Sequence, residues 1–235
     1  MTETRLFALL ESLKRSIEKM TWKPAGTEWA DYYTTHNYED AALGHKAQIV
    51  ESFLDRVKPT NIWDLGANTG RFSRLGSDRG IPTYAFDIDP AAVELNYLQV
   101  KNQGETNLLP LVMDLANPSS GIGWASEERM SLNERGPAGA ILALALLHHL
   151  AIGNNLPFDL IADFFSRLSE WLVIEFVPKE DAQVQRMLQS REDIFTNYTQ
   201  EHFQNAFSIW FEIVAVEFIK SSQRSLYLMR RRDET

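Results

Sequence analysis

The chain has 235 residues, of which 44% are hydrophobic, and this composition supports one sizeable core rather than two independent domains. It contains no cysteine, which excludes disulfides, thiolate metal sites and cysteine nucleophiles. Its formal net charge of −9 disfavours broad electrostatic attraction to nucleic acid.

The first predicted element is an amphipathic helix, because apolar residues recur at helical spacing near the N-terminus. They are Leu6, Leu9, Leu10, Leu13, Ile17 and Met20. Charges interrupt this segment, which therefore lacks a signal-peptide pattern, and no run reaches the roughly 18 apolar residues of a membrane span. We interpret the helix as a lid packed on the protein, and we expect a soluble cytoplasmic protein with no membrane partner.

A second helix is predicted over Leu43–Val57 and is closed by Pro59. Short apolar strands alternate with amphipathic stretches beyond this point, whereas the residues before it contain the two predicted helices and an aromatic, polar stretch from Glu28 to Tyr38. We therefore expect an N-terminal helical cap at residues 1–58 and a ligand-binding domain at residues 59–235, together forming one structural unit.

The alternation after Pro59 is typical of an α/β, doubly wound sheet that is mostly parallel and is covered by helices on both faces. The predicted strands of this part are Asn61–Leu65, Thr83–Asp87, Leu108–Met113, Ala140–Leu146 and Trp171–Phe176. The predicted helices are 71–79, 90–102, 126–135, 155–169, 181–190 and 199–207. Two long final strands, Trp210–Ile219 and Ser225–Met229, predict a C-terminal antiparallel hairpin.

The most informative segment runs from Ile62 to Gly70, where an apolar strand ends in Asp64 and a turn bounded by Gly66 and Gly70 follows. Glycines let the backbone approach a ligand closely, and a helix is predicted directly after the turn. A second acid, Asp87, ends the next strand. In doubly wound folds, an acid about 20 residues after such a turn binds the ribose hydroxyls of a nucleoside.

Two kinds of ligand compete for this turn. A dinucleotide enzyme needs Gly-x-Gly-x-x-Gly, but Asn68 stands where the middle glycine would be. The carboxylate of Asp64 would repel a pyrophosphate and suit a cation. S-adenosylmethionine (SAM), with an ammonium, a sulfonium and a ribose, is such a ligand. The segment Asp64–Gly70 resembles motif I of the class I SAM-dependent methyltransferases, which disfavours a dehydrogenase.

The resemblance implies a seven-stranded sheet with the closing hairpin at its antiparallel end, and it covers roughly residues 45–230. It also implies SAM as cofactor and S-adenosylhomocysteine (SAH) as product. Asp64, Gly66, Asn68 and Gly70 would then form the turn around the cofactor.

Further cofactor contacts follow from the same resemblance. Asp87 would bind the ribose diol, with Asp89 as the alternative if the strand register differs, although Asp89 also suits a helix N-cap before Pro90. Asp114 would accept a hydrogen bond from the adenine amino group, or it is simply a turn aspartate.

The segment before the first strand offers two more candidate contacts with the cofactor. Lys46 would meet the methionine carboxylate of SAM, and Tyr33 or Tyr38 would cover the sulfonium by a cation–π contact. Equally, these residues could belong to a surface helix with half-buried tyrosines.

The fourth predicted strand leads into His148 and His149, at the edge where the family transfers the methyl group. An imidazole could act as general base, with an ionisation near neutrality. Neighbouring strand residues point to opposite faces, so we expect one imidazole, His149, to reach the site. Alternatively, both only shape the pocket. Adjacent histidines are poorly placed to chelate together, so no metal is expected.

Glu175, near the end of an apolar strand, would be costly to bury without a partner. It could orient an imidazole or bind a substrate amine, or it could form an ion pair with a lysine or arginine. The segment from Glu175 to Asp181 resembles a poorly characterised bacterial branch that includes nodulation-type methyltransferases.

The sequence thus indicates SAM-dependent methyl transfer to a small-molecule or saccharide acceptor, at oxygen. The acidic charge weighs against DNA, whereas a protein acceptor and the oligomeric state stay open. The alternative is a non-catalytic domain that binds SAM or SAH as a sensor or partner subunit.

Overall fold

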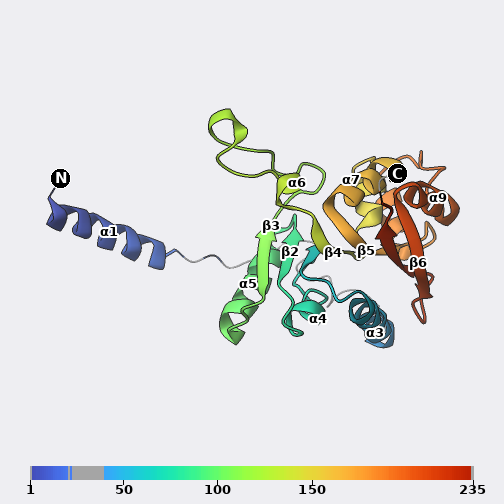
Figure 1. Cartoon of the computed structure of the whole chain (residues 1–235), viewed down its shortest axis with the longest axis horizontal. Helices are drawn as coiled ribbons and strands as arrows, with labels where there is room; N and C mark the ends of the chain where they lie inside the picture. Colours follow the sequence, from blue (N-terminus) through green and yellow to red (C-terminus); the bar gives the residue numbers. More distant parts are fainter. Residues whose placement is uncertain (1, 21, 23–39, 234–235) are drawn as a thin grey trace.

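The computed structural model describes residues 2–20, 22 and 40–233, and it contains a seven-stranded sheet in the order β3-β2-β1-β4-β5-β7-β6 (Figure 1). The strands are β1 (Ile62–Leu65), β2 (Thr83–Asp87), β3 (Leu108–Val112), β4 (Ala138–Ala143), β5 (Ser169–Phe176), β6 (Phe211–Phe218) and β7 (Ser225–Arg231). Strands β1 to β5 pair in parallel, whereas β7 is antiparallel to both β5 and β6. The predicted fold class is therefore confirmed, including the C-terminal hairpin.

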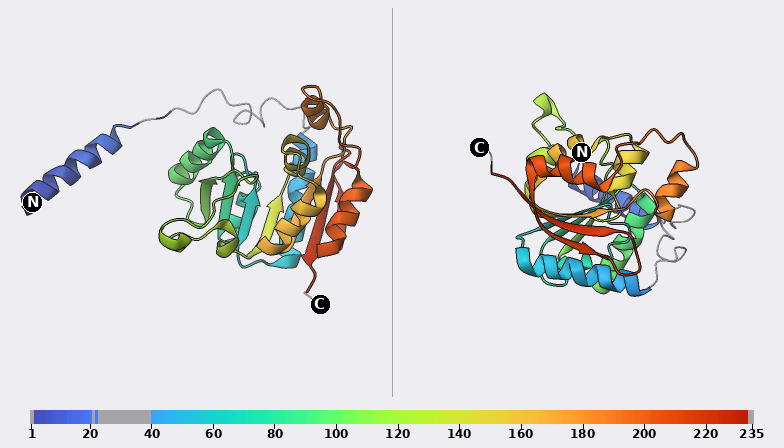
Figure 2. Two further views of the ribbon diagram at one scale, coloured as in Figure 1. Left: turned by 90° about the horizontal axis from the view of Figure 1, so that it is seen from above. Right: turned by 90° about the vertical axis from the view of Figure 1, so that its right-hand side faces the viewer.

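Helices cover both faces of the sheet, as Figure 2 shows for α3 and α9. The helices after residue 39 are α3 (Asp40–Val57), α4 (Arg74–Ser77), α5 (Pro90–Gln103), α6 (Leu132–Arg135), α7 (Phe158–Leu168), α8 (Ala182–Leu188) and α9 (Gln200–Trp210). Alternate residues of β5 pack on opposite faces of the sheet. Leu172 and Ile174 belong to the core cluster beneath α7 and α9, whereas Val173 belongs to the cluster beneath α3. Burial on both faces explains why the central strands are apolar throughout.

The N-terminal region divides into two helices with different surroundings. Helix α1 (Glu3–Glu18) has no buried residue, whereas α3 buries Val50, Phe53 and Leu54 in the sheet core. The division into a cap and a domain remains a prediction. Within the described ranges, every helix is too short or too polar to traverse a membrane.

Two predicted helices are much shorter than the sequence pattern suggested. The helix expected over 71–79 is confined to α4, and only α6 forms within 126–135. The second difference has a local cause, because Ala125 and Ser126 have positive φ angles of 55° and 61°. Residues with left-handed backbone cannot continue a right-handed helix, so this segment turns back on itself through the Ile122–Arg129 bridge.

The fourth strand also ends earlier than predicted, at Ala143 rather than Leu146. Ala145 has a φ of +50°, which takes the backbone out of the extended conformation. The histidines that follow consequently lie in a short helical segment and not on a strand.

Candidate functional site

A cavity of about 300 Å³ opens at the carboxyl ends of the parallel strands. Segments that follow β1, β2, β3 and β4 contribute to its lining, through residues that include Gly66, Asp87, Asp114 and Ala145. Ligands of open α/β sheets bind at this edge. The fold therefore brings together side chains that lie far apart in the sequence.

The glycine-bounded turn after β1 forms one wall of the cavity. Gly66 has a φ of +76° and lines the cavity, and Asn68 has a φ of +51°. Asparagine tolerates left-handed backbone better than most residues, which explains how it replaces the expected middle glycine. The N–H of Asn68 donates to Oδ2 of Asp87 at 2.7 Å, so this carboxylate on β2 fixes the turn.

Gly70 serves a different contact from Gly66. A Cβ at Gly70 would lie 2.4 Å from the side chain of Asn96, which is buried on α5. Gly70 is absent from the described residues that line the cavity. The geometry assigns it to close packing between the turn and α5, and its predicted cofactor contact remains a prediction.

Asp64 is a buried carboxylate at the end of β1 and lines the cavity. Burial raises its pKa to about 7, although the hydroxyl of Ser73, which donates to Oδ2 at 2.6 Å, and the charge of Lys46 act in the opposite direction. A cationic ligand group beside this carboxylate would stabilise its ionised form.

Asp87, the last residue of β2, and Asp89, which follows the strand, have separate roles. Asp87 lines the cavity and accepts the N–H groups of Asn68 and Asp89, and burial raises its pKa. Asp89 caps α5 by accepting the Ala91 N–H at 2.8 Å and is absent from the described cavity lining. Asp89 is therefore the N-cap of α5, as one of its two alternatives proposed.

Asp114, after β3, makes the local turn contact that was one of its two alternatives, and its contact with adenine remains a prediction. Its Oδ1 accepts the Ala116 N–H at 2.8 Å in a local turn, and the residue also lines the cavity. Ile88, Met113 and Leu115 supply apolar lining beside it.

The adjacent histidines are arranged differently from the strand-based expectation. His149 begins a short π-helix over His149–Gly153 and lines the cavity, whereas His148 is buried and is not among the described lining residues. The imidazole that reaches the cavity is that of His149, but its direction follows from the helical backbone and not from the alternation of side chains along a strand. Burial and the charge of Arg224 lower the pKa of His149 to about 4, so the expected ionisation near neutrality is wrong.

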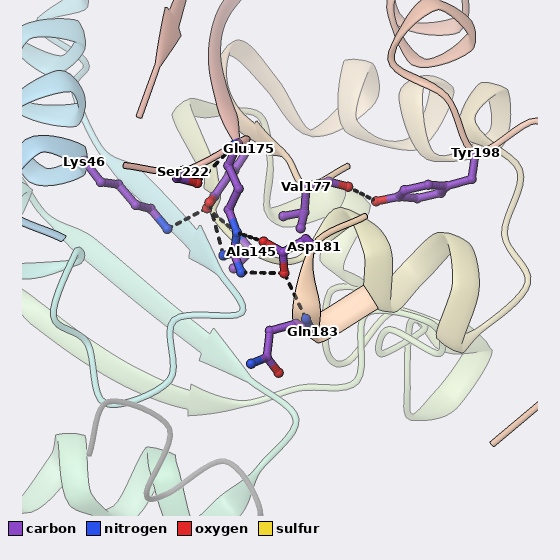
Figure 3. Close-up of polar contacts among 9 residues, drawn as sticks. Lys46, Ala145, Glu175, Val177, Asp181, Gln183, Tyr198 and Ser222 are labelled. Carbon is purple, nitrogen blue, oxygen red and sulfur yellow. Dashed lines mark hydrogen bonds and ion pairs between the residues drawn. The ribbon is translucent and has the colours of Figure 1, made fainter. Parts of the chain in front are cut away.

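Glu175 lies in a buried network of charges rather than on the cavity surface (Figure 3). Its Oε2 accepts from Lys46 Nζ at 2.5 Å, and its Oε1 lies 3.4 Å from a guanidinium nitrogen of Arg224. Burial alone would raise the pKa of Glu175, but Lys46 and Arg224 hold it below its usual value. The ion-pair alternative is the one observed.

The two cations of this network differ from the anions in their position. Lys46 and Arg224 line the cavity, whereas Asp181, which binds Arg224 through two hydrogen bonds of 2.7 and 3.0 Å, is not among the described lining residues. Sequence reasoning missed Arg224, because a single arginine in the turn before β7 carries no recognisable spacing. The predicted contact of Tyr33 lies outside the described residues.

The sequence is similar to a curated protein over nearly its whole length. Nodulation protein NoeA of Rhizobium meliloti (strain 1021) is 37% identical over 228 residues, which cover 97% of this chain and 46% of NoeA. The chain thus spans about half the length of the relative that it matches. No known protein-family model matches the chain.

Solved structures extend the comparison to the fold. The 16S rRNA methylase ArmA is 16% identical with a TM-score of 0.56, and the match covers 88% of this chain and 92% of ArmA. Magnesium protoporphyrin IX methyltransferase ChlM from Synechocystis PCC 6803 with bound SAH is 14% identical with a TM-score of 0.56, over 84% of this chain and 89% of ChlM. At such identities the likeness concerns the fold.

Alanine at Gly70 is expected to destabilise the protein more than alanine at Gly80. Both glycines have a φ of +77°, so left-handed backbone adds a similar penalty of roughly 1 kcal/mol at each position. Only the Cβ at Gly70 meets an obstacle, Asn96, since among the described residues nothing lies within 4 Å of a Cβ at Gly80. We expect chemical denaturation to show about 1 kcal/mol more loss for Gly70→Ala. Equal losses would contradict the packing role.

Proposed function

Since the chain has the fold of the class I SAM-dependent methyltransferases, we propose that it binds SAM and transfers its methyl group to a small-molecule or saccharide oxygen. One observation carries this proposal: the turn at Gly66 and the carboxylates of Asp64 and Asp87 line a single cavity at the carboxyl edge of the sheet.

The residues of the cavity fit the parts of SAM. Asp87 retains acceptor capacity for ribose hydroxyls beside its backbone contacts, and Asp114 can accept from an adenine amino group. The ionised form of Asp64 suits the ammonium, and Lys46 suits the methionine carboxylate. When bound, SAM supplies a methyl group made electrophilic by the sulfonium.

His149 is the group best placed to receive a proton from an acceptor hydroxyl. It lines the cavity, and its lowered pKa keeps the imidazole neutral, which is the form that accepts a proton, throughout the physiological pH range. A weakly basic imidazole adds less to the rate than alignment does. Most of the acceleration would come from holding acceptor and methyl group in line at about 3 Å.

The choice of a small acceptor rests on charge and on the sequence resemblance. ArmA is a 16S rRNA methylase, but the net charge of −9 on this chain opposes a polyanionic acceptor. The match with NoeA, a nodulation protein, agrees with the nodulation-type resemblance of Glu175–Asp181. That resemblance implies a small-molecule or saccharide hydroxyl as acceptor.

Calorimetry of the full chain with SAM, SAH and NAD tests the cofactor. We expect binding of SAM and SAH without binding of NAD, because the Asp64 carboxylate repels a pyrophosphate. Tight NAD binding without SAM binding would contradict the proposal. Incubation with labelled SAM and fractionated metabolites then tests transfer, and SAM binding without transfer to any fraction would favour the sensor alternative.

Substitutions of Asp87 and Asp89, at the end of β2 and just after it, should have contrasting effects. Asp87→Ala is expected to weaken SAM binding by about 1–3 kcal/mol, since it removes the ribose acceptor and the support of the Asn68 N–H. Asp89→Ala should instead lower the unfolding free energy by about 1 kcal/mol through the lost N-cap. SAM calorimetry and chemical denaturation of both variants measure these effects. If Asp89→Ala weakened SAM binding more than Asp87→Ala does, the assignment of Asp87 to the ribose would be wrong.

His149→Ala is expected to lower turnover by about 10²–10⁴-fold with little change in SAH affinity. Because the pKa of His149 is about 4, the wild-type rate should be level between about pH 6 and 8 and should fall only at acidic pH. His148→Ala is the matched control, since His148 is buried away from the described cavity lining. Full activity of the His149→Ala variant would show that His149 is not the general base, and it would indicate an acceptor that is already anionic.

A further inference from the structure

The turn after β4 forms a wall of the cavity in a conformation that its residues do not favour. Leu144, Ala145 and Leu146 all line the cavity, and Ala145 has a φ of +50°. Left-handed backbone is unfavourable for a residue that carries a Cβ. Surrounding contacts must therefore hold this wall in place.

The carboxylate of Glu175 supplies such a contact. Its Oε2 accepts the backbone N–H of Ala145 at 2.8 Å and, at the same time, the ammonium of Lys46 at 2.5 Å (Figure 3). One oxygen of β5 thus connects the β4 turn to helix α3.

Glu175 is held in its charged form although its exposed fraction is 0%. Lys46 and Arg224 flank the carboxylate, and Asp181 binds the far side of Arg224. A carboxylate that is ionised makes a stronger hydrogen bond to a backbone N–H than a neutral acceptor does. The buried charges therefore strengthen the contact with Ala145.

The position of Ala145 controls two parts of the site. The side chain of the next residue, Leu146, comes within 3.2 Å of the point that a Cβ on Gly66 would occupy, so it faces the glycine turn. The carbonyl of Leu146 accepts the N–H groups of His149 and Leu150 at 2.9 and 3.3 Å. A shift at Ala145 would displace both the wall and His149.

The opposite wall repeats this arrangement. Asn68, with a φ of +51°, donates its N–H to Asp87 at 2.7 Å. Asp87 on β2 and Glu175 on β5 each follow by one residue the last position paired with the neighbouring strand, β1 or β4. Two turns with left-handed, non-glycine residues are thus held by carboxylates in equivalent places.

We propose that Glu175 is a positioning residue that fixes the β4 turn through the Ala145 N–H and thereby holds Leu146 and His149 in place for the ligand. Glu175 is absent from the described residues that line the cavity, so it acts from behind the wall. The inference rests on the proposed function in that its ligand is SAM or SAH.

A double-mutant cycle between positions 175 and 145 tests the proposal, with SAH affinity measured by calorimetry. Glu175→Leu should weaken binding on the order of tenfold to a hundredfold. Adding Ala145→Gly should restore most of that affinity, because glycine adopts the left-handed conformation without support. Ala145→Gly alone completes the cycle, and its own effect on SAH affinity is subtracted when the coupling between the two positions is calculated.

Asp181→Asn is the matched control, since it weakens the same charge network at Arg224 while leaving the bond between Glu175 and Ala145. Glycine at position 145 should give no recovery in this background. Additive effects of Glu175→Leu and Ala145→Gly, or equal recovery in the control, would overturn the proposal.

Hydrogen exchange of the Ala145 amide provides a readout that needs neither SAH nor the leucine variant. In the nearly isosteric Glu175→Gln protein, this amide should exchange on the order of tenfold faster than in wild type, while β1 amides stay protected. Unchanged protection would overturn the proposal. A wild-type protein that binds neither SAM nor SAH would contradict the proposed function, and the exchange result would still decide the role of Glu175.

Discussion

A hydrogen bond from a backbone N–H to a carboxylate on the neighbouring strand determines the shape of this site. It occurs after β1, where Asn68 donates to Asp87, and again after β4, where Ala145 donates to Glu175. In both places the donor is a non-glycine residue in left-handed conformation. The cavity lies between these two turns, so its width depends on carboxylates that belong to the neighbouring strands.

The charges around the cavity follow from this arrangement. Asp87 keeps its contacts with backbone N–H groups, whereas Glu175 is buried completely and needs Lys46 and Arg224 to remain ionised. Burial lowers the pKa of both histidines, and the same cations add to this effect at His148, as Arg224 does at His149. The side of the cavity near β5 and β7 thus carries the cations, and the side near β1 to β3 carries acids that suit a cationic ligand.

The sequence predicted the parts of the fold that depend on apolar patterns and on glycine. The strand positions, the closing hairpin and the cluster of acids at one sheet edge all follow from such patterns. The early end of β4 could not be predicted, because a left-handed alanine has no sequence signature and depends on Glu175, which is 30 residues away. Likewise, the low pKa of His149 arises from burial and from Arg224, which only the folded chain brings near it.

A crystal structure of the protein with SAH would test most directly whether the cavity is the cofactor site. We expect SAH along the carboxyl ends of β1, β2 and β4, with its ribose hydroxyls on Asp87 and its homocysteine carboxylate toward Lys46. A cavity that stays free of SAH at saturating concentration, or one that accepts a nicotinamide dinucleotide in its place, would contradict the proposed cofactor.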